Sequence, residues 1–383
     1  MAEYVQFIAL LASLYIASGG ILIQIDKEAT PLANVSLLLI GALISNVIGT
    51  TGASMLLIRP FIRLNKDTIQ AYHIIFFIFM VSNIGGALTP IGDPPLFLGF
   101  LKGVPFFWTL SHNWPAWIFA LSLLAVAFYV IDRKFGGAAE QQKPLSTPSA
   151  SSFQLIGGKN FLWLLIVIVA VFLDPNVLPW VPGIHYDGQT FSFLRELIML
   201  SVAYLSYRLA DKRALKGNEF NFEPIREVAF IFIGIFGTMM PALELVGNFA
   251  KSPEGAALIT PNSLFWGTGI LSGFLDNAPT YLNFLAAAMA SQGASIGTLE
   301  MVREFALDGY ENSAFELMAI SIAAVFFGAM TYIGNGPNFM VKSIAEQSGI
   351  KMPSFFGYIL RFSLPLLLPV LFLVWLVFFA FAG

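Results

Sequence analysis

Two aspartates, Asp93 and Asp276, lie in the middle of strongly apolar stretches of the sequence. Asp93 stands between Gly92 and Pro94 in GALTPIGDPPLF, and Asp276 lies in LDNAP. Placing a charged residue inside a membrane costs about 2.5 to 3.5 kcal/mol on insertion scales, so each aspartate predicts a functional site. Because desolvation favours the protonated form of a carboxyl group, Asp93 could exchange a proton for a sodium ion. Capping of the helix that follows is the alternative role for both aspartates.

Amide and hydroxyl side chains accompany both aspartates. Such neutral oxygen atoms are suitable ligands for a hard cation, and amides at the N-termini of half-helices also suit a carboxylate substrate. The expected ion or proton ligands are Asp93, Asp276, Asn277, Thr280, Thr50, Thr51, Asn46, Thr89, Gly92, Thr331 and Asn335, with sodium bound by Asp93 and Asp276. The expected substrate contacts are Asn83, Asn338, Pro94 and Pro337. Hydrogen bonding between helices is the alternative role for Asn83.

The stretch that contains Asp93 occurs twice. GALTPIGDPPLF at 86–97 aligns with GAMTYIGNGPNF at 328–339, which places Asp93 opposite Asn335. A weaker repeat aligns 36–62 with 262–290 and pairs Thr50 with Asn277. Gly and Pro interrupt helical hydrogen bonding, and broken apolar segments in both halves of a chain indicate the binding site of a transporter.

The composition predicts an all-α polytopic membrane protein. Of the 383 residues, 57% are hydrophobic and only 11% are charged, and the mean hydropathy is +0.76. The small net charge of −3 gives no reason to expect nucleic-acid binding. The sequence has no cysteine, which excludes disulfides and thiolate metal sites.

Apolar segments long enough to cross a membrane divide the chain into two similar halves. Each half contains a span, a re-entrant helical hairpin, a broken transmembrane helix and a further span. The predicted divisions are a first repeat at 1–131 with hairpin 36–62 and broken helix 72–101, a linker at 132–159, a scaffold helix pair at 160–225, and a second repeat at 226–383 with hairpin 262–290 and broken helix 313–345. The first span is expected at 4–25, and the scaffold spans at 160–181 and 192–210.

The distribution of Lys and Arg predicts the orientation. The linker 132–159 and the loop after 192–210 are basic, whereas the loop 174–191 between them has no Lys or Arg. The positive-inside rule therefore places the linker in the cytoplasm of a multi-pass protein of the cell inner membrane. The first hairpin then enters from the cytoplasm and the second from outside, so the two repeats are inverted. His73 is interpreted as an interfacial residue at the cytoplasmic start of its span.

The motifs SNIGGALTPIGDPP, LDNAPTYLNF and TYIGNGPNFM resemble those of the ion transporter superfamily. This superfamily includes NhaD-type sodium/proton antiporters, dicarboxylate/sodium symporters, citrate/metal symporters and arsenite exporters. The resemblance implies two inverted repeats, a scaffold that forms homodimers, elevator-type movement and additional helices before the first repeat. Asp93 matches the aspartate of NhaD-type antiporters, whereas GNGPNF looks more like the carboxylate symporters.

These observations predict a secondary sodium/proton antiporter that works by an elevator-type mechanism. A sodium-coupled symporter of citrate or a dicarboxylate is the alternative. We expect no catalytic residues and no enzyme activity, because the paired helical signatures of an intramembrane aspartyl protease are absent. We expect no cofactor beyond the sodium ion and the proton. The expected partners are membrane lipid, a small cation or carboxylate, and a second copy of the chain, with no nucleic acid.

Overall fold

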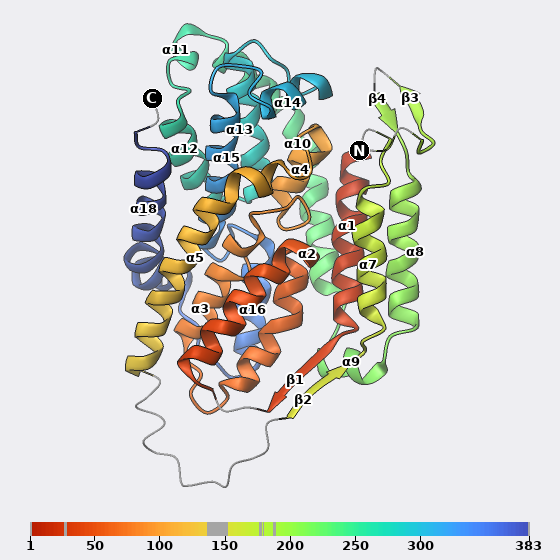
Figure 1. Ribbon diagram of the computed structural model, residues 1–383, viewed down its shortest axis with the longest axis vertical. Coiled ribbons are helices and arrows are strands. Elements are labelled where there is room, and N and C mark those ends of the chain that lie inside the picture. The colour runs from red at the N-terminus through yellow and green to blue at the C-terminus, as the bar shows by residue number, and fades with distance from the viewer. Residues whose placement is uncertain are drawn as a thin grey trace.

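The computed structural model describes residues 2–26, 29–135, 152–175, 178, 180–186 and 189–381. In this part of the chain the fold is almost entirely α-helical, with two small two-stranded sheets (Figure 1). Among the described residues, four helical segments have the length and hydropathy of a membrane span: Pro31–Leu64, Trp108–Phe135, Ser313–Met330 and Phe355–Phe378. The first of these, Pro31–Leu64, has non-helical backbone at Gly49 and is not one straight crossing. A fifth candidate is α10 (Glu223–Ala250), which bends by 45° near Pro241. The prediction of an all-α polytopic membrane protein is therefore confirmed at this level.

The first half of the chain runs from α1 to α5. Its elements are α1 (Ala2–Gly19), β1 (Leu22–Asp26), α2 (Pro31–Leu64), α3 (Ala71–Met80), the short 3₁₀ helix η1 (Ile84–Gly86), α4 (Pro94–Lys102) and α5 (Trp108–Phe135). The broken helix predicted at 72–101 corresponds to α3, η1 and α4. The chain between η1 and α4 is irregular, as the Gly and Pro residues of this stretch require.

Helix α2 is folded in two at Gly49, which has φ 78° and ψ 155°. The side chains of Asn34 and Asn65, 31 residues apart, exchange two hydrogen bonds of 2.8 Å. A straight helix would separate these residues by about 46 Å. The two arms therefore lie antiparallel, with the polar turn at one end and the Asn34–Asn65 pair at the other.

The second half also contains a pair of packed helices followed by a broken helix, with the additional short helices α11 (Pro253–Ala256) and α14 (Leu299–Ala306). It comprises α10, α11, α12 (Pro261–Phe274), α13 (Asn277–Ser291), α14, α15 (Ser313–Phe327), η2 (Gly328–Met330), α16 (Gly336–Gln347), α17 (Phe355–Tyr358), the π-helix η3 (Ile359–Leu367) and α18 (Leu368–Phe378). Helices α12 and α13 pack together and are joined by Leu275 and Asp276. The broken helix predicted at 313–345 corresponds to α15, η2 and α16.

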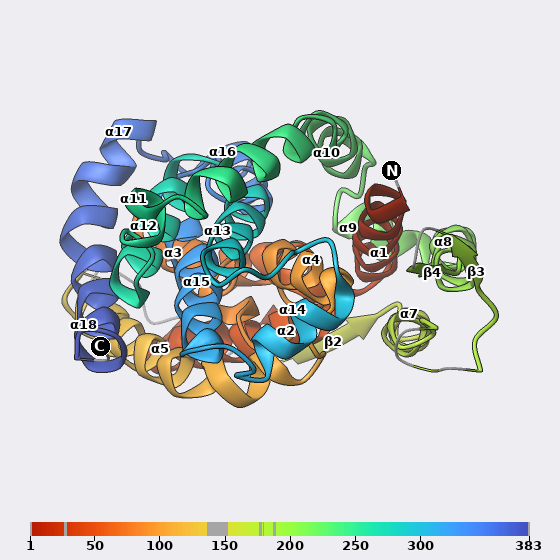
Figure 2. The ribbon, with the colours of Figure 1, turned by 90° about the horizontal axis from the view of Figure 1, so that it is seen from above.

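A segment of helices and short strands connects the two halves. Its elements are β2 (Ser152–Ile156), α7 (Asn160–Val171), β3 (Ile184–Tyr186), β4 (Gln189–Phe191), α8 (Leu194–Arg208) and α9 (Lys212–Gly217). Helices α1, α7 and α8 pack against one another on one side of the molecule, next to α10 (Figure 2). The remaining helices form a second, larger group around α3 and α15.

The broken helices occupy the centre of the fold. Every residue of α3 from Tyr72 to Met80 is buried. Within Ser313–Met330, 83% of the residues are buried, compared with 33 to 39% in the most apolar windows of the other three candidate segments. Those outer spans expose many apolar side chains, which is the arrangement expected where lipid replaces water. The polar breaks therefore lie where the surrounding protein can satisfy them.

Four predicted segments differ in their bounds from the structure. The span expected at 4–25 ends as a helix at Gly19, and Leu22–Asp26 instead forms β1, which pairs antiparallel with β2 from the predicted linker 132–159. That linker also overlaps the end of α5, and its residues 136–151 lie outside the described part. The spans expected at 160–181 and 192–210 are the shorter helices α7 and α8. Pairing with a distant strand satisfies the backbone of 22–26 as well as helix formation would.

Candidate functional site

Asp93 lies at the point where both hairpin turns and both broken helices meet. Its side chain is only 1% exposed. Its Oδ1 accepts hydrogen bonds from Thr50 Oγ1 at 2.7 Å and from Asn335 Nδ2 at 2.8 Å, and its Oδ2 accepts one from Asn277 Nδ2 at 2.7 Å. Thr50 belongs to the turn of α2, Asn277 to the turn between α12 and α13, and Asn335 to the second broken helix. Asp93 therefore joins four elements that are far apart in the sequence.

The side chain of Asp93 does not cap the helix that follows it. Asp93 occupies the N-cap position of α4, but its carboxylate accepts no hydrogen bond from the first turn of that helix. All of its side-chain hydrogen bonds come from neutral donors on other elements. In the described part of the chain no Lys, Arg or His pairs with it. The alternative role as a cap is therefore not supported for this side chain.

Local backbone geometry brings the turn of α2 to Asp93. The positive φ of Gly49 is a conformation that L-residues with a side chain rarely adopt. Immediately after it, the Thr50 N–H donates to the Gly92 carbonyl oxygen at 2.8 Å. A Cβ atom added to Gly92 would overlap the backbone carbonyl of Gly86. Glycine is required at 92 because two backbone segments meet there without room for a side chain.

The second break repeats these contacts. A Cβ atom on Gly334 would overlap the carbonyl oxygen of Gly328, as it would at the aligned pair Gly92 and Gly86. Thr89 Oγ1 donates to the Asn46 carbonyl oxygen at 2.5 Å. At the aligned positions, Thr331 Oγ1 donates to the Gly273 carbonyl oxygen at 2.7 Å. The two sequence alignments therefore bring together positions that make equivalent hydrogen bonds, and the aligned residues Asp93 and Asn335 contact each other directly.

Two further asparagines connect the two breaks. Asn83 Nδ2 donates to Asn338 Oδ1 at 2.7 Å, and Asn338 Nδ2 donates to the carbonyl oxygens of Gly328 and Thr331. Asn335 Nδ2 also donates to the Ser82 carbonyl oxygen at 3.2 Å. These contacts satisfy backbone groups that the broken helices leave free. They also fit the alternative role of Asn83 in hydrogen bonding between helices.

Two buried amide oxygens next to Asp93 have no hydrogen-bond partner. They are Oδ1 of Asn83 and Oδ1 of Asn277. A Cβ atom on Gly328 would lie 2.9 Å from Asn83 Oδ1 and 3.3 Å from Asn277 Nδ2, so the two amides face the same small region. Buried acceptors without partners are uncommon in folded proteins. Unpaired amide oxygens are chemically suited to a hard cation.

Asp276 has a different environment. It is partly buried at the N-cap of α13, where its Oδ1 accepts the N–H of Ala278 at 3.0 Å. No hydrogen bond joins it to Asp93, although the two turns are neighbours. Thr280 donates its hydroxyl proton to the Asp276 carbonyl oxygen. This geometry matches the alternative interpretation, a helix cap with Pro279 in the first turn.

The other predicted site residues fall into two groups. Asn46, Thr89, Gly92 and Thr331 form the framework just described, and Pro94 and Pro337 lie in the first turns of α4 and α16. Thr51 follows Thr50 on α2 but makes no hydrogen bond to the site. In the described part of the chain no group of three or more His, Cys, Asp or Glu residues could hold a metal ion.

Asp132 is a further buried carboxylate, and its burial is not predicted by the sequence. Asp132 was assigned to the start of the linker, but it lies in α5 and is 3% exposed. Its oxygens accept hydrogen bonds from Tyr72 and Asn34, and His73, which was expected at the interface, is fully buried beside it. A polar residue near the end of an apolar helix gives no local signal that distinguishes it from a loop residue.

A buried carboxylate at the junction of broken helices, in a protein with several membrane-spanning helices, is typical of a secondary transporter. The family described as "putative citrate transport" matches residues 1–379, and the chain belongs to this family. Uncharacterized transporters of Mycobacterium bovis and Mycobacterium tuberculosis are each 23% identical over 337 residues, covering 84% of this chain and 71% of theirs. The protein is therefore a multi-pass membrane transporter and not an enzyme.

Proposed function

We propose that the protein exchanges sodium ions for protons at Asp93. The observation that carries this proposal is a fully buried carboxylate held by neutral donors from three other elements. A site without Lys or Arg suits a cation better than an anion. The free oxygens of Asn83 and Asn277 supply two more ligands for the ion.

Proton and sodium binding at Asp93 exclude each other in this proposal. A sodium ion needs the carboxylate oxygens that Thr50, Asn277 and Asn335 now occupy as donors. The Thr50 hydroxyl can rotate and the Asn277 amide can turn so that both present oxygen atoms instead. Cation binding at Asp93 therefore rearranges the turn of α2 and the turn between α12 and α13. In this proposal the conformation of these two turns depends on whether the site is occupied.

The transport cycle that we propose is alternating access by two inverted repeats. The folded helix α2 and the α12–α13 pair act as re-entrant hairpins that enter from opposite sides of the membrane. Helices α1, α7, α8 and α10 form a scaffold, and the group around α3 and α15 moves against it as an elevator. Equivalent contacts in the two breaks support the repeat. The Lys and Arg distribution supports the orientation in an inner membrane, and the resemblance supports a homodimer.

The second candidate function is sodium-coupled symport of a carboxylate. The family description favours it, since it names citrate transport. Asn83 and Asn338, together with the N-termini of α4 and α16, could contact a carboxylate. A substrate with several negative charges would need bound cations in this site, because Asp93 is itself an anion and no basic side chain faces it.

A flux assay on proteoliposomes separates the two functions. With a pH-sensitive dye inside the vesicles, we expect an inward sodium gradient to drive protons out without any carboxylate present. We expect radiolabelled citrate and succinate to remain outside at the level of protein-free vesicles. Sodium-dependent uptake of either carboxylate, without proton movement driven by sodium alone, would replace the antiport proposal with the symport one. A panel of lithium, potassium and magnesium gradients in the same assay identifies the preferred cation.

A further inference from the structure

His73 makes two contacts that depend on its protonation state. Its Nδ1 accepts the backbone N–H of Gln70 at 3.1 Å, and its Nε2 lies 3.1 Å from Asp132 Oδ1, off the ideal hydrogen-bond direction. An acceptor nitrogen carries no proton, so the hydrogen-bond network assigns the neutral ring with its proton on Nε2. His73 therefore caps the start of α3 and faces a buried carboxylate at the same time.

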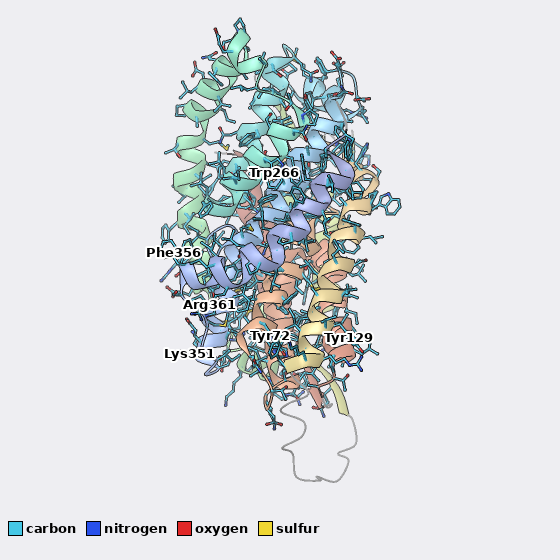
Figure 3. The ribbon with its side chains drawn as sticks, turned by 90° about the vertical axis from the view of Figure 1, so that its left-hand side faces the viewer. Tyr72, Tyr129, Trp266, Lys351, Phe356 and Arg361 are labelled. Atoms are coloured by element: carbon cyan, nitrogen blue, oxygen red, sulfur yellow. The ribbon has the colours of Figure 1, made fainter. Side chains whose placement is uncertain are left out.

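The carboxylate beside His73 has only neutral donors. Asp132 Oδ1 accepts Tyr72 Oη at 2.7 Å, and its Oδ2 accepts Asn34 Nδ2 at 3.0 Å. Asn34 in turn is paired with Asn65, so this cluster closes the base of the α2 hairpin. Figure 3 shows Tyr72 and Tyr129 of α5 at the same level, toward the lower end of the helices and well below Trp266.

Among the described residues, no ionisable group other than Tyr72 and His73 faces Asp132 from the elements packed around it. Helix α3 contributes Tyr72 and His73, whereas α2 contributes only the two asparagines. The charged residues nearest in sequence on α2, on the loop after it and on α5 are exposed, namely Arg63, Lys66, Asp67, Arg133 and Lys134. Arg63 instead donates to the Gly217 carbonyl oxygen. The nearest site for a compensating positive charge is the imidazole ring of His73.

We propose that His73 is a second proton-binding site, separate from Asp93, in which one proton replaces the α3 cap with an ion pair to Asp132. The proton adds to Nδ1, which can then no longer accept the Gln70 N–H. The charged ring now faces the Asp132 carboxylate. Helix α3 leads directly to Ser82 and Asn83 in the first break, so this proton affects the end of the helix opposite the transport site.

The cluster of His73 and Asp132 lies at the end of the helices that is predicted to face the cytoplasm. The lower ends of α2, α3 and α5 lie on the same side as β1, β2 and α9 (Figure 1). This is the side that the Lys and Arg distribution assigns to the cytoplasm. A proton at His73 would therefore report cytoplasmic pH, whereas Asp93 lies at the centre of the fold.

Nitrogen NMR of the imidazole rings tests the proposal without any transport assay. The full-length protein, labelled with ¹⁵N-histidine in nanodiscs, is titrated from pH 8 to pH 5, and His73→Gln assigns the signals among the three histidines. Acidification should change the His73 Nδ1 signal from that of an acceptor nitrogen to that of an N–H group. In Asp132→Asn this change should be weaker over the same range, since the charge that faces the protonated ring is lost. A His73 Nδ1 signal that is the same at pH 8 and at pH 5, or a response in Asp132→Asn equal to that of the wild type, would overturn the proposal.

Hydrogen exchange tests the consequence for α3. After correction for intrinsic rates, we expect the Gln70 amide to exchange about fivefold faster at pH 5.5 than at pH 8, the ratio typical of one lost cap. His73→Gln should remove this difference, because glutamine at this position of a capping box accepts the same N–H and does not titrate. His112→Gln, on a partly buried histidine of α5, is the matched control and should behave like the wild type. Equal pH dependence in His73→Gln and wild type would contradict the proposal.

Discussion

Replacing Asp93 by asparagine is expected to abolish sodium-driven proton movement while leaving the protein folded. Among the described residues, Asp93 is the carboxylate that hydrogen-bonds to Thr50, Asn277 and Asn335, and removing a buried charged partner costs about 2 to 5 kcal/mol. We therefore expect the exchange rate to fall by about a hundredfold or more in the proteoliposome assay. The substituted side chain would present an N–H₂ group toward Asn277, but the Asn277 amide can turn, since its Oδ1 has no partner.

Asp276→Asn is the informative comparison for this variant. Asparagine is as good an N-cap as aspartate, so a capping residue tolerates the change. Because Asp276 caps α13 and makes no hydrogen bond to Asp93, we expect exchange within about threefold of the wild-type rate, the range left by a preserved cap. A loss as large as that of Asp93→Asn would instead make Asp276 the second carrier, as the sequence predicts. Similar unfolding temperatures of the three proteins would show that the fold is retained.

Gly92→Ala is expected to have the largest effect on stability. The added Cβ would overlap the Gly86 carbonyl oxygen, and both are backbone segments that other contacts hold in place. Overpacking of this kind costs about 3 kcal/mol. The expected result is a clear loss of thermal stability in detergent, measured by the unfolding temperature of the purified protein. Gly334→Ala should behave in the same way, because it would overlap Gly328.

Gly234→Ala is the matched control for these variants. No atom lies within 4 Å of the position that its Cβ would occupy, and Gly234 lies inside helix α10. Alanine has the higher helix propensity by about 1 kcal/mol, so stability should be equal or greater. A Gly92→Ala protein that is as stable as Gly234→Ala would show that the two breaks are not packed as described.

The polar breaks could be predicted because their signals are local. Gly and Pro within an apolar segment leave backbone groups without helical partners, and this is visible in one window of sequence. The repeat then placed Asp93 opposite Asn335 and Thr50 opposite Asn277. In the structure all four side chains meet. The internal repeat served as a second, independent constraint on which residues share a site.

Other features depend on distant contacts that no window of sequence contains. Residues 22–25 continue the apolar run of the predicted span 4–25. Their strand conformation depends on the pairing of 22–26 with 152–156, which is distant in the sequence. Asp276 has the same sequence environment whether it caps a helix or binds an ion. Tyr72 and Asp132 are 60 residues apart, so their hydrogen bond and the burial of His73 could not be inferred from either segment alone.

The most direct test of the central claim is sodium binding to the purified protein as a function of pH. If one sodium ion and one proton compete for the Asp93 carboxylate, the apparent Kd for sodium should rise about tenfold for each unit that the pH falls on the acidic limb. Binding should also release about one proton per ion in a weakly buffered solution. A sodium Kd that is independent of pH in the wild type, or sodium binding that is unchanged in Asp93→Asn, would contradict the proposed exchange at Asp93.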